Sequence, residues 1–162
     1  MLHHPEYRGK YAANLRRELP RIPFAPDFAA FAGAGAKLAE LHVGYESQKE
    51  YPLKRVEAPG ARLDLRVDRM KLSKDKTALQ YNGFLTFEGI PNEVHEYRLG
   101  NRSALEWVID QYRVERDKAD PEKIISDPNR PDDEGYILRL VGQVVTVSVE
   151  TVNLVHSLPP LE

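Results

Sequence analysis

A chain of 162 residues, 41% of them hydrophobic and 30% charged, is long enough to bury a core and has the composition of an ordinary globular protein. The lack of cysteine excludes disulfide bonds and thiolate metal sites. Neither a signal peptide nor an apolar run of membrane-spanning length is evident, so we expect a cytoplasmic protein. A net charge of −2 argues against a generally basic DNA-binding chain and leaves only a local basic patch for such a role.

Helices are predicted for residues 1–45. Pro5 suits the first position of a helix, whose apolar stripe recurs every four residues at Tyr7, Tyr11, Leu15 and Leu19. Asp27 is a good N-cap for a second helix that continues to the end of this segment. Because glycine weakens a helix, we expect Gly33 and Gly35 to be there to allow close approach of another element.

An antiparallel meander is predicted for residues 61–99. Apolar and charged residues alternate over Leu63–Val67, which is typical of a half-buried strand. Two further strands are expected at Thr77–Tyr81 and Phe84–Phe87. The dipeptide Asn82–Gly83 between them predicts a tight hairpin, since both residues tolerate positive φ.

The remaining segments are a polar connection over 46–60, a surface loop over 115–134 and two helices. Ser103 and Glu106 form a capping-box pattern at the start of a helix over 103–114. Residues 135–158 are apolar throughout; the valines alternate as in a strand, but the length favours a long buried helix. Residues 90–97 are ambiguous and fit a short helical turn followed by a strand through Glu96–Leu99.

These elements predict an α+β fold in which helices pack around a small antiparallel β-meander, with a long C-terminal helix. No catalytic centre or metal site is apparent, because the five histidines lack ligand spacing and the acidic residues form no credible pair. Phe31–Ala36 is similar to the Phe-x-Gly-x-Gly signature of S-adenosylmethionine methyltransferases. No apolar strand precedes it, so helix packing is the favoured interpretation.

Basic residues around the first β-turn are the remaining candidate for function. A hairpin tip with several cations can reach phosphates or enter the major groove, although a hydrated polar turn would have the same composition. Base edges could be read by Gln80, Asn82 and Arg102. The full set of residues expected to contact DNA is Arg66, Arg69, Lys71, Lys74, Lys76, Asn82 and Arg102.

The segment Ile90–Gly100, IPNEVHEYRLG, resembles the I-P-x-E-(V/A)-x-x-Y-x-(I/L/V)-G segment near the C-terminus of large restriction–modification polypeptides. The continuation Ser103–Tyr112 is similar too. So are 4–23, at the beginning of the domain in that family, and 145–161, at its end. The chain is thereby identified as similar, over nearly its whole length, to the C-terminal target recognition (specificity) domain of type ISP restriction enzymes, which are often labelled DEAD/DEAH-box helicases.

In that family one polypeptide joins a nuclease, a helicase-like ATPase, an adenine methyltransferase and the target recognition domain. The resemblance implies that residues 1–162 are a single domain excised from such a polypeptide. It would bind a double-stranded DNA sequence and present it to the methyltransferase and helicase–nuclease parts. It would have no catalysis or cofactor of its own, whereas the parent would use S-adenosylmethionine, ATP and Mg²⁺.

The implied partners are therefore double-stranded DNA and the methyltransferase and helicase-like domains of the same polypeptide, with no membrane. The alternative is a structural domain that docks the methyltransferase to the rest of the enzyme without base readout. Whether Leu161–Glu162 are native stays open. Within Ile90–Tyr112 we expect Trp107 to lie in the core, so that Trp107→Ala would cost several kcal/mol.

Overall fold

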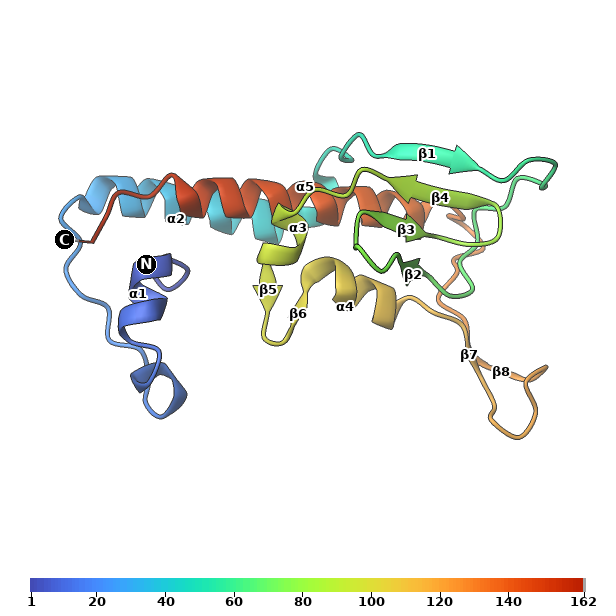
Figure 1. Ribbon diagram of the computed structural model, residues 1–162, viewed down its shortest axis with the longest axis horizontal. Coiled ribbons are helices and arrows are strands. Elements are labelled where there is room, and N and C mark those ends of the chain that lie inside the picture. Colours follow the sequence, from blue (N-terminus) through green and yellow to red (C-terminus); the bar gives the residue numbers. More distant parts are fainter. Residues whose placement is uncertain (162) are drawn as a thin grey trace. The chain divides into compact units, whose positions relative to one another are not determined.

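The computed structural model describes residues 1–161 (Figure 1). These residues form two compact units. Unit 1 comprises Met1–Gly44 together with the residues from Glu150 onwards, and unit 2 comprises Tyr45–Val149. The long helix α5, Tyr136–His156, contributes its first part to unit 2 and its last part to unit 1. Helices combined with small antiparallel sheets confirm the predicted α+β class.

Unit 1 contains α1 (Pro5–Lys10), a 3₁₀ turn η1 (Asn14–Arg16) and α2 (Phe28–Val43). The Asp27 carboxylate caps α2 as predicted, by accepting a hydrogen bond of 2.9 Å from the backbone N–H of Ala30.

Side-chain hydrogen bonds join helices α1 and α2 to other segments of unit 1. His42 of α2 lies 2.8 Å, Nε2 to Oγ1, from Thr151 in the last part of α5. The buried Tyr7 donates a hydrogen bond of 2.8 Å to the carbonyl oxygen of Arg21. The expectation for Gly33 and Gly35 was wrong: no neighbouring element of the described chain comes within 4 Å of a Cβ placed at either position.

The main sheet of unit 2 has four antiparallel strands in the order β1 (Lys54–Glu57), β4 (Leu85–Glu88), β3 (Ala78–Gln80) and β2 (Lys71–Leu72) (Figure 1). Leu72 pairs with Leu79, which pairs with Phe87, and this row faces the core. The neighbouring row places Lys71, Gln80 and Thr86 on the opposite face, since side chains alternate along each strand.

The strand predicted at Leu63–Val67 was wrong, because this segment is extended chain without a ladder. Its backbone groups are bound by side chains instead. The Tyr81 hydroxyl donates to the Leu65 carbonyl at 2.9 Å, and the Asn129 side chain exchanges two hydrogen bonds with the backbone of Val67. The first strand of the sheet is β1, inside the segment 46–60 that was predicted to be a connection; only one apolar residue of β1 signals it.

The predicted reversal at Asn82–Gly83 joins β3 to β4, but its mechanism differs from the one expected. Neither residue has a positive φ. The Asn82 side-chain oxygen accepts hydrogen bonds from the backbone N–H groups of Phe84 and Leu85, at 2.9 and 2.8 Å. The side chain therefore closes the turn, as in an Asx turn, without a left-handed backbone.

The ambiguous segment 90–97 forms the helical turn α3 (Glu93–Glu96). The short strand β5 (Arg98–Leu99) follows, as expected, and pairs with β6 (Arg102–Ser103) in a hairpin. Helix α4 (Ala104–Gln111) follows, and its capping box is present as predicted: Ser103 accepts from the Glu106 N–H, and the Glu106 carboxylate accepts from the Ser103 N–H.

Trp107 does not lie in the core, so that expectation was wrong. Its side chain is 41% exposed, donates its indole N–H to the Leu99 carbonyl at 3.0 Å, and lies beneath the Arg102 guanidinium at 5.0 Å. The apolar stripe of α4 instead runs through Leu105, Val108 and Ile109, which pack on the core.

The segment predicted as a surface loop carries a small hairpin of β7 (Glu115–Arg116) and β8 (Ile124–Ser126). Helix α5 confirms the helix predicted over 135–158. By length and composition α5 could cross a membrane, but 61% of its apolar window is buried inside the protein, as in a core helix.

The turn η2 (Tyr45–Ser47) precedes Tyr51, whose backbone N–H donates to the Gly142 carbonyl of α5 at 3.0 Å.

Candidate nucleic-acid interface

Two adjoining hollows of unit 2 lie between strands β2 and β3 on one side and helix α4 on the other. The larger has a volume of about 680 Å³ and the smaller about 440 Å³, and they share Arg69, Met70, Glu106 and Ile109. We refer to both together as the β2–α4 groove. Its other lining residues are Asp68, Lys71, Leu72, Gln80, Asn82, Gly83, Asn101, Arg102, Asp110 and Arg113.

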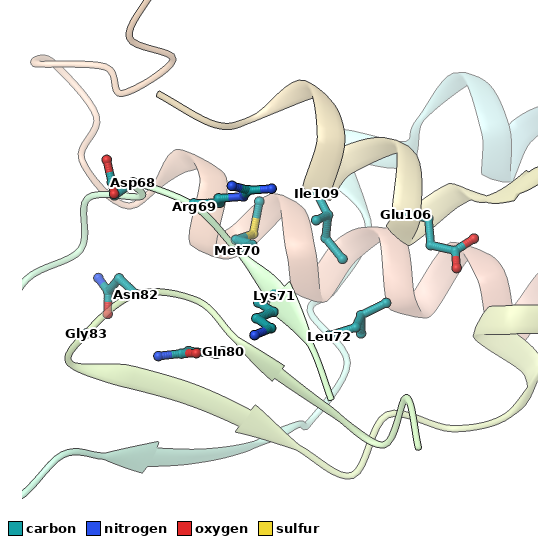
Figure 2. Close-up of a pocket in the computed structure, with 10 residues that line it drawn as sticks. All are labelled: Asp68, Arg69, Met70, Lys71, Leu72, Gln80, Asn82, Gly83, Glu106 and Ile109. Carbon is teal, nitrogen blue, oxygen red and sulfur yellow. The ribbon is translucent and has the colours of Figure 1, made fainter. Parts of the chain in front are cut away.

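The sheet register brings Lys71 and Gln80 together in this groove. They are direct partners on β2 and β3, so their side chains stand on the same face of the sheet (Figure 2). Strand β2 is at the end of the strand order, which leaves this two-stranded edge facing the groove. Arg69 precedes β2 and lies in the groove near them (Figure 2).

Asn82 lines the groove, but its amide is already bound within the protein. Its nitrogen donates to the carbonyl oxygens of Asp64 and Arg66, at 2.9 and 2.8 Å, while its oxygen accepts the two turn hydrogen bonds described above. An amide with four internal hydrogen bonds has used its donors and its acceptor sites. The residue therefore fixes the wall of the groove.

Three predicted cations form ion pairs with carboxylates of the protein. Arg66 binds Asp127 at 2.8 Å and Lys76 binds Glu106 at 2.9 Å. Arg102 binds Asp110 at 2.8 Å and also covers Trp107. Lys76 has a φ of 61°, the left-handed conformation, in the turn that points its ammonium group towards α4.

Two carboxylates of the groove, Glu106 and Asp110, have a pKa that their partners lower. The hydrogen bond from Lys76, followed by that from the Ser103 backbone, lowers the pKa of Glu106 from 4.5 to about 2. Arg102 lowers the pKa of Asp110, which also binds Arg113 at 3.0 Å. Asp68 is bound to Arg116 at 2.6 Å. Each acidic side chain in the groove thus has a cation of its own.

Four exposed polar side chains in or near the groove take no part in these ion pairs and hydrogen bonds: Arg69, Lys71, Lys74 and Gln80. Within residues 1–161 none of the four has a hydrogen bond or ion pair from its side chain. Their donor groups are available to a ligand, and the three cations are not neutralised by a neighbour.

The structure brings four of the seven residues predicted to contact DNA to the groove: Arg69, Lys71, Asn82 and Arg102. Lys74 and Lys76 lie in the turn between β2 and β3, and Arg66 lies on the adjoining extended segment, outside the lining. Arg113 was missed by sequence reasoning. Its spacing of three from Asp110, within the helix predicted over 103–114, was the available signal.

The alternative sites suggested by the sequence receive no support. Phe31–Ala36 lies within helix α2, so the glycines do not form the turn that a methyltransferase signature requires. Across residues 1–161 no three histidine or acidic side chains are grouped so as to hold a metal ion.

Comparison with known proteins links this chain to restriction–modification systems. A family model described as the type ISP C-terminal specificity domain matches residues 1–140. The structure of the ATP-dependent type ISP restriction–modification enzyme LlaBIII bound to DNA is 35% identical, with a TM-score of 0.85; the match covers 99% of this chain and 10% of LlaBIII. A search of curated proteins gave no match.

Two further solved structures are similar. A nuclease-deletion mutant of the type ISP enzyme LlaGI, in complex with a DNA substrate mimic, is 38% identical, with a TM-score of 0.86, over 99% of this chain and 13% of that one. The DrdV–DNA complex is 39% identical, with a TM-score of 0.80, over 98% of this chain and 17% of that one. The chain thus spans only a small part of the length of each match.

Proposed function

The chain belongs to the type ISP C-terminal specificity domain family, and on that premise we propose that it recognises a double-stranded DNA sequence through the β2–α4 groove. It would present this sequence to an adenine methyltransferase and a helicase–nuclease in the same polypeptide, acting in the cytoplasm. The chemistry, and with it S-adenosylmethionine, ATP and Mg²⁺, would belong to those other parts.

The observation that carries the proposal is the set of unpaired cations beside the groove. Phosphates attract cations that have no internal partner, because forming the contact then breaks no ion pair. Arg69, Lys71 and Lys74 meet that condition, and we assign them to the DNA backbone. The match to enzymes solved with DNA supports the same ligand.

The remaining predicted residues are given a positioning role in this proposal. Arg66, Lys76 and Arg102 would each have to leave a carboxylate before they could bind a phosphate. We propose that their ion pairs hold the walls of the groove, as the hydrogen bonds of Asn82 do. Direct contact between these four residues and DNA stays a prediction.

The proposal is tested by DNA binding as a function of salt. Each lost phosphate contact lowers the slope of log K against log salt by about 0.9, so Arg69→Ala, Lys71→Ala and Lys74→Ala should each reduce it. Lys118→Ala is the matched control, because Lys118 is an exposed lysine of unit 2 outside the groove. Equal slopes for all four variants would contradict the proposed interface.

A hybrid enzyme tests specificity. Replacing the matched segment of LlaBIII by this chain should change the sequence that the enzyme modifies. A folded, active hybrid that keeps the LlaBIII sequence would show that recognition lies elsewhere.

An exposed apolar run in unit 1 favours an additional docking role. Leu19, Ile22 and Phe28 are 90%, 66% and 78% exposed, and Phe24 between them is also fully accessible. Apolar groups grouped in this way commonly mark an interface. We propose that this run packs on the methyltransferase part of the polypeptide. In the hybrid enzyme, Phe24→Ser with Phe28→Ser should lower modification while leaving DNA binding by the isolated chain unchanged.

A further inference from the structure

The side-chain amide of Gln80 is the one neutral polar group of the β2–β3 edge, within residues 1–161, that is exposed and unbound. Gln80 pairs with Lys71 of β2 and with Thr86 of β4, so the three side chains share the outer face of the sheet. Figure 2 shows Gln80 beside Lys71. Asn82, two residues further along, offers a contrast, since its amide is consumed by four internal hydrogen bonds. Gln80 therefore carries a free donor and a free acceptor into the groove.

That pair of groups suits a base edge better than a phosphate. A phosphate presents acceptors alone and would leave the amide oxygen of Gln80 unmatched. The major-groove edge of adenine presents an acceptor, N7, beside a donor, the N6 amino group, and a glutamine amide matches both at once. The other major-groove edges lack that acceptor–donor pair on a single base.

The position of Gln80 also allows such a contact. The major groove admits a two-stranded β-ribbon, and β2–β3 is an edge ribbon because β2 ends the strand order. The side chains of Lys71 and Gln80 stand together on its outer face, with Arg69 just before β2. Cations beside an uncharged amide would hold the DNA backbone while the amide meets the bases.

Building on the proposed function, we infer that Gln80 is a specificity-determining residue that reads an adenine in the major groove of the recognised sequence. Arg69 and Lys71 anchor the phosphates beside that base pair. Loss of the amide then affects the preference at one position of the sequence. It does not affect the general, salt-dependent affinity for DNA.

The experiment is selection from a pool of randomised duplexes by the wild-type chain, Gln80→Ala and Gln80→Glu, followed by sequencing of the bound fraction. The wild type should prefer adenine at one position by about tenfold to a hundredfold. Gln80→Ala should lose that preference and keep all others. Gln80→Glu should shift it towards cytosine, whose N4 amino group donates to a carboxylate. Gln111→Ala, an exposed glutamine outside the groove, should select the wild-type sequence.

The outcomes separate this inference from the proposed function. If Gln80→Ala and Gln80→Glu select the wild-type sequence unchanged, or if they weaken binding to all sequences equally, Gln80 does not read a base, while the interface itself stands. If the wild-type chain enriches no sequence, either alone or within the LlaBIII hybrid, the proposed function fails and the inference fails with it.

Discussion

The side-chain nitrogen of Asn82 lies 2.8 Å from the carbonyl oxygen of Arg66, to which it donates a hydrogen bond across sixteen positions of sequence. Together with its bonds to Asp64, Phe84 and Leu85, this contact fastens the extended segment before β2 to the turn between β3 and β4. Asn82 was expected to meet DNA. Its hydrogen bonds hold the extended segment that leads into β2 against the turn whose residues Asn82 and Gly83 line the groove.

Asn82→Ala should therefore lower the free energy of unfolding by about 2 kcal/mol or more, because four backbone groups lose a partner. Urea denaturation of the purified chain measures this. Asn82→Asp keeps the acceptor and loses both donors, so it should fall between the wild type and alanine. Gln80→Ala serves as the control and should remain within about 0.5 kcal/mol of the wild type. A fully stable Asn82→Ala variant would remove the basis for its positioning role.

Glu106 predicts an acid-sensitive contribution to stability. Its pKa in the folded protein is lowered from 4.5 to about 2, so the fold favours the ionised carboxylate. The contribution, at most about 3 kcal/mol, is fully present above pH 4.5 and is lost as the pH falls from there towards 2. The variant Glu106→Gln keeps a capping-box side chain but has no charge.

The stability difference between the wild type and Glu106→Gln should accordingly shrink between pH 6 and pH 2. Denaturant midpoints across that range measure it. A difference that is constant with pH would mean that the ion pair with Lys76 contributes nothing measurable. Lys76→Met should reproduce most of the effect at pH 6, because the Lys76 hydrogen bond is the main cause of the shift.

Trp107→Ala should be tolerated better than its size suggests. The side chain is 41% exposed, so its truncation loses one hydrogen bond to Leu99 and the stacked Arg102, about 1–2 kcal/mol together. Leu105→Ala, fully buried on the same helix, should cost about 2–5 kcal/mol. Thermal or urea unfolding of the two variants measures which of them loses more stability. A larger loss for Trp107→Ala than for Leu105→Ala would mean that Trp107 belongs to the core.

Gly142→Ala should destabilise the protein even though alanine is the better helix former. A Cβ at Gly142 would lie 2.9 Å from the Glu50 Cβ and 3.4 Å from its Cα, next to the hydrogen bond from Tyr51. We expect a loss of about 1–3 kcal/mol from this overpacking. Gly33→Ala in α2 meets open space and should instead stabilise by about 0.5–1 kcal/mol. Stabilisation by both substitutions, measured by urea unfolding, would contradict the close approach at Gly142.

Helices α2, α4 and α5 could be predicted because their signals are local, whereas α1 ends at Lys10 although its predicted stripe continued to Leu19. The Asp27 cap, the capping box at Ser103 and the length of the apolar run in α5 each act within a few turns, and each appears in the structure. Strands depend on partners that are remote in sequence. The segment Leu63–Val67 has the alternating sequence of a strand but pairs with no other strand of the described chain. Strand β1 pairs with β4, although its sequence shows almost no alternation of apolar and polar residues.

Charge and turn signals in the sequence predicted a basic hairpin, and its residues Arg69 and Lys71 line the groove. Contact between this hairpin and DNA stays a prediction. Which cations are free depends on carboxylates brought in from distant elements, such as Glu106 beside Lys76 or Asp127 beside Arg66. No local sequence pattern predicts those ion pairs.

The division between bound and unbound side chains has a consequence for how such a domain can change over generations. Substitutions at Arg69, Lys71 or Gln80 break no internal hydrogen bond or ion pair within residues 1–161, so mutation can vary them at little cost to folding. Asn82 and Glu106 line the same groove and lack that freedom, because each is bound within the protein. Under the proposed function, the recognised DNA sequence could thus change through substitutions at a few exposed positions, with the surrounding scaffold unaltered.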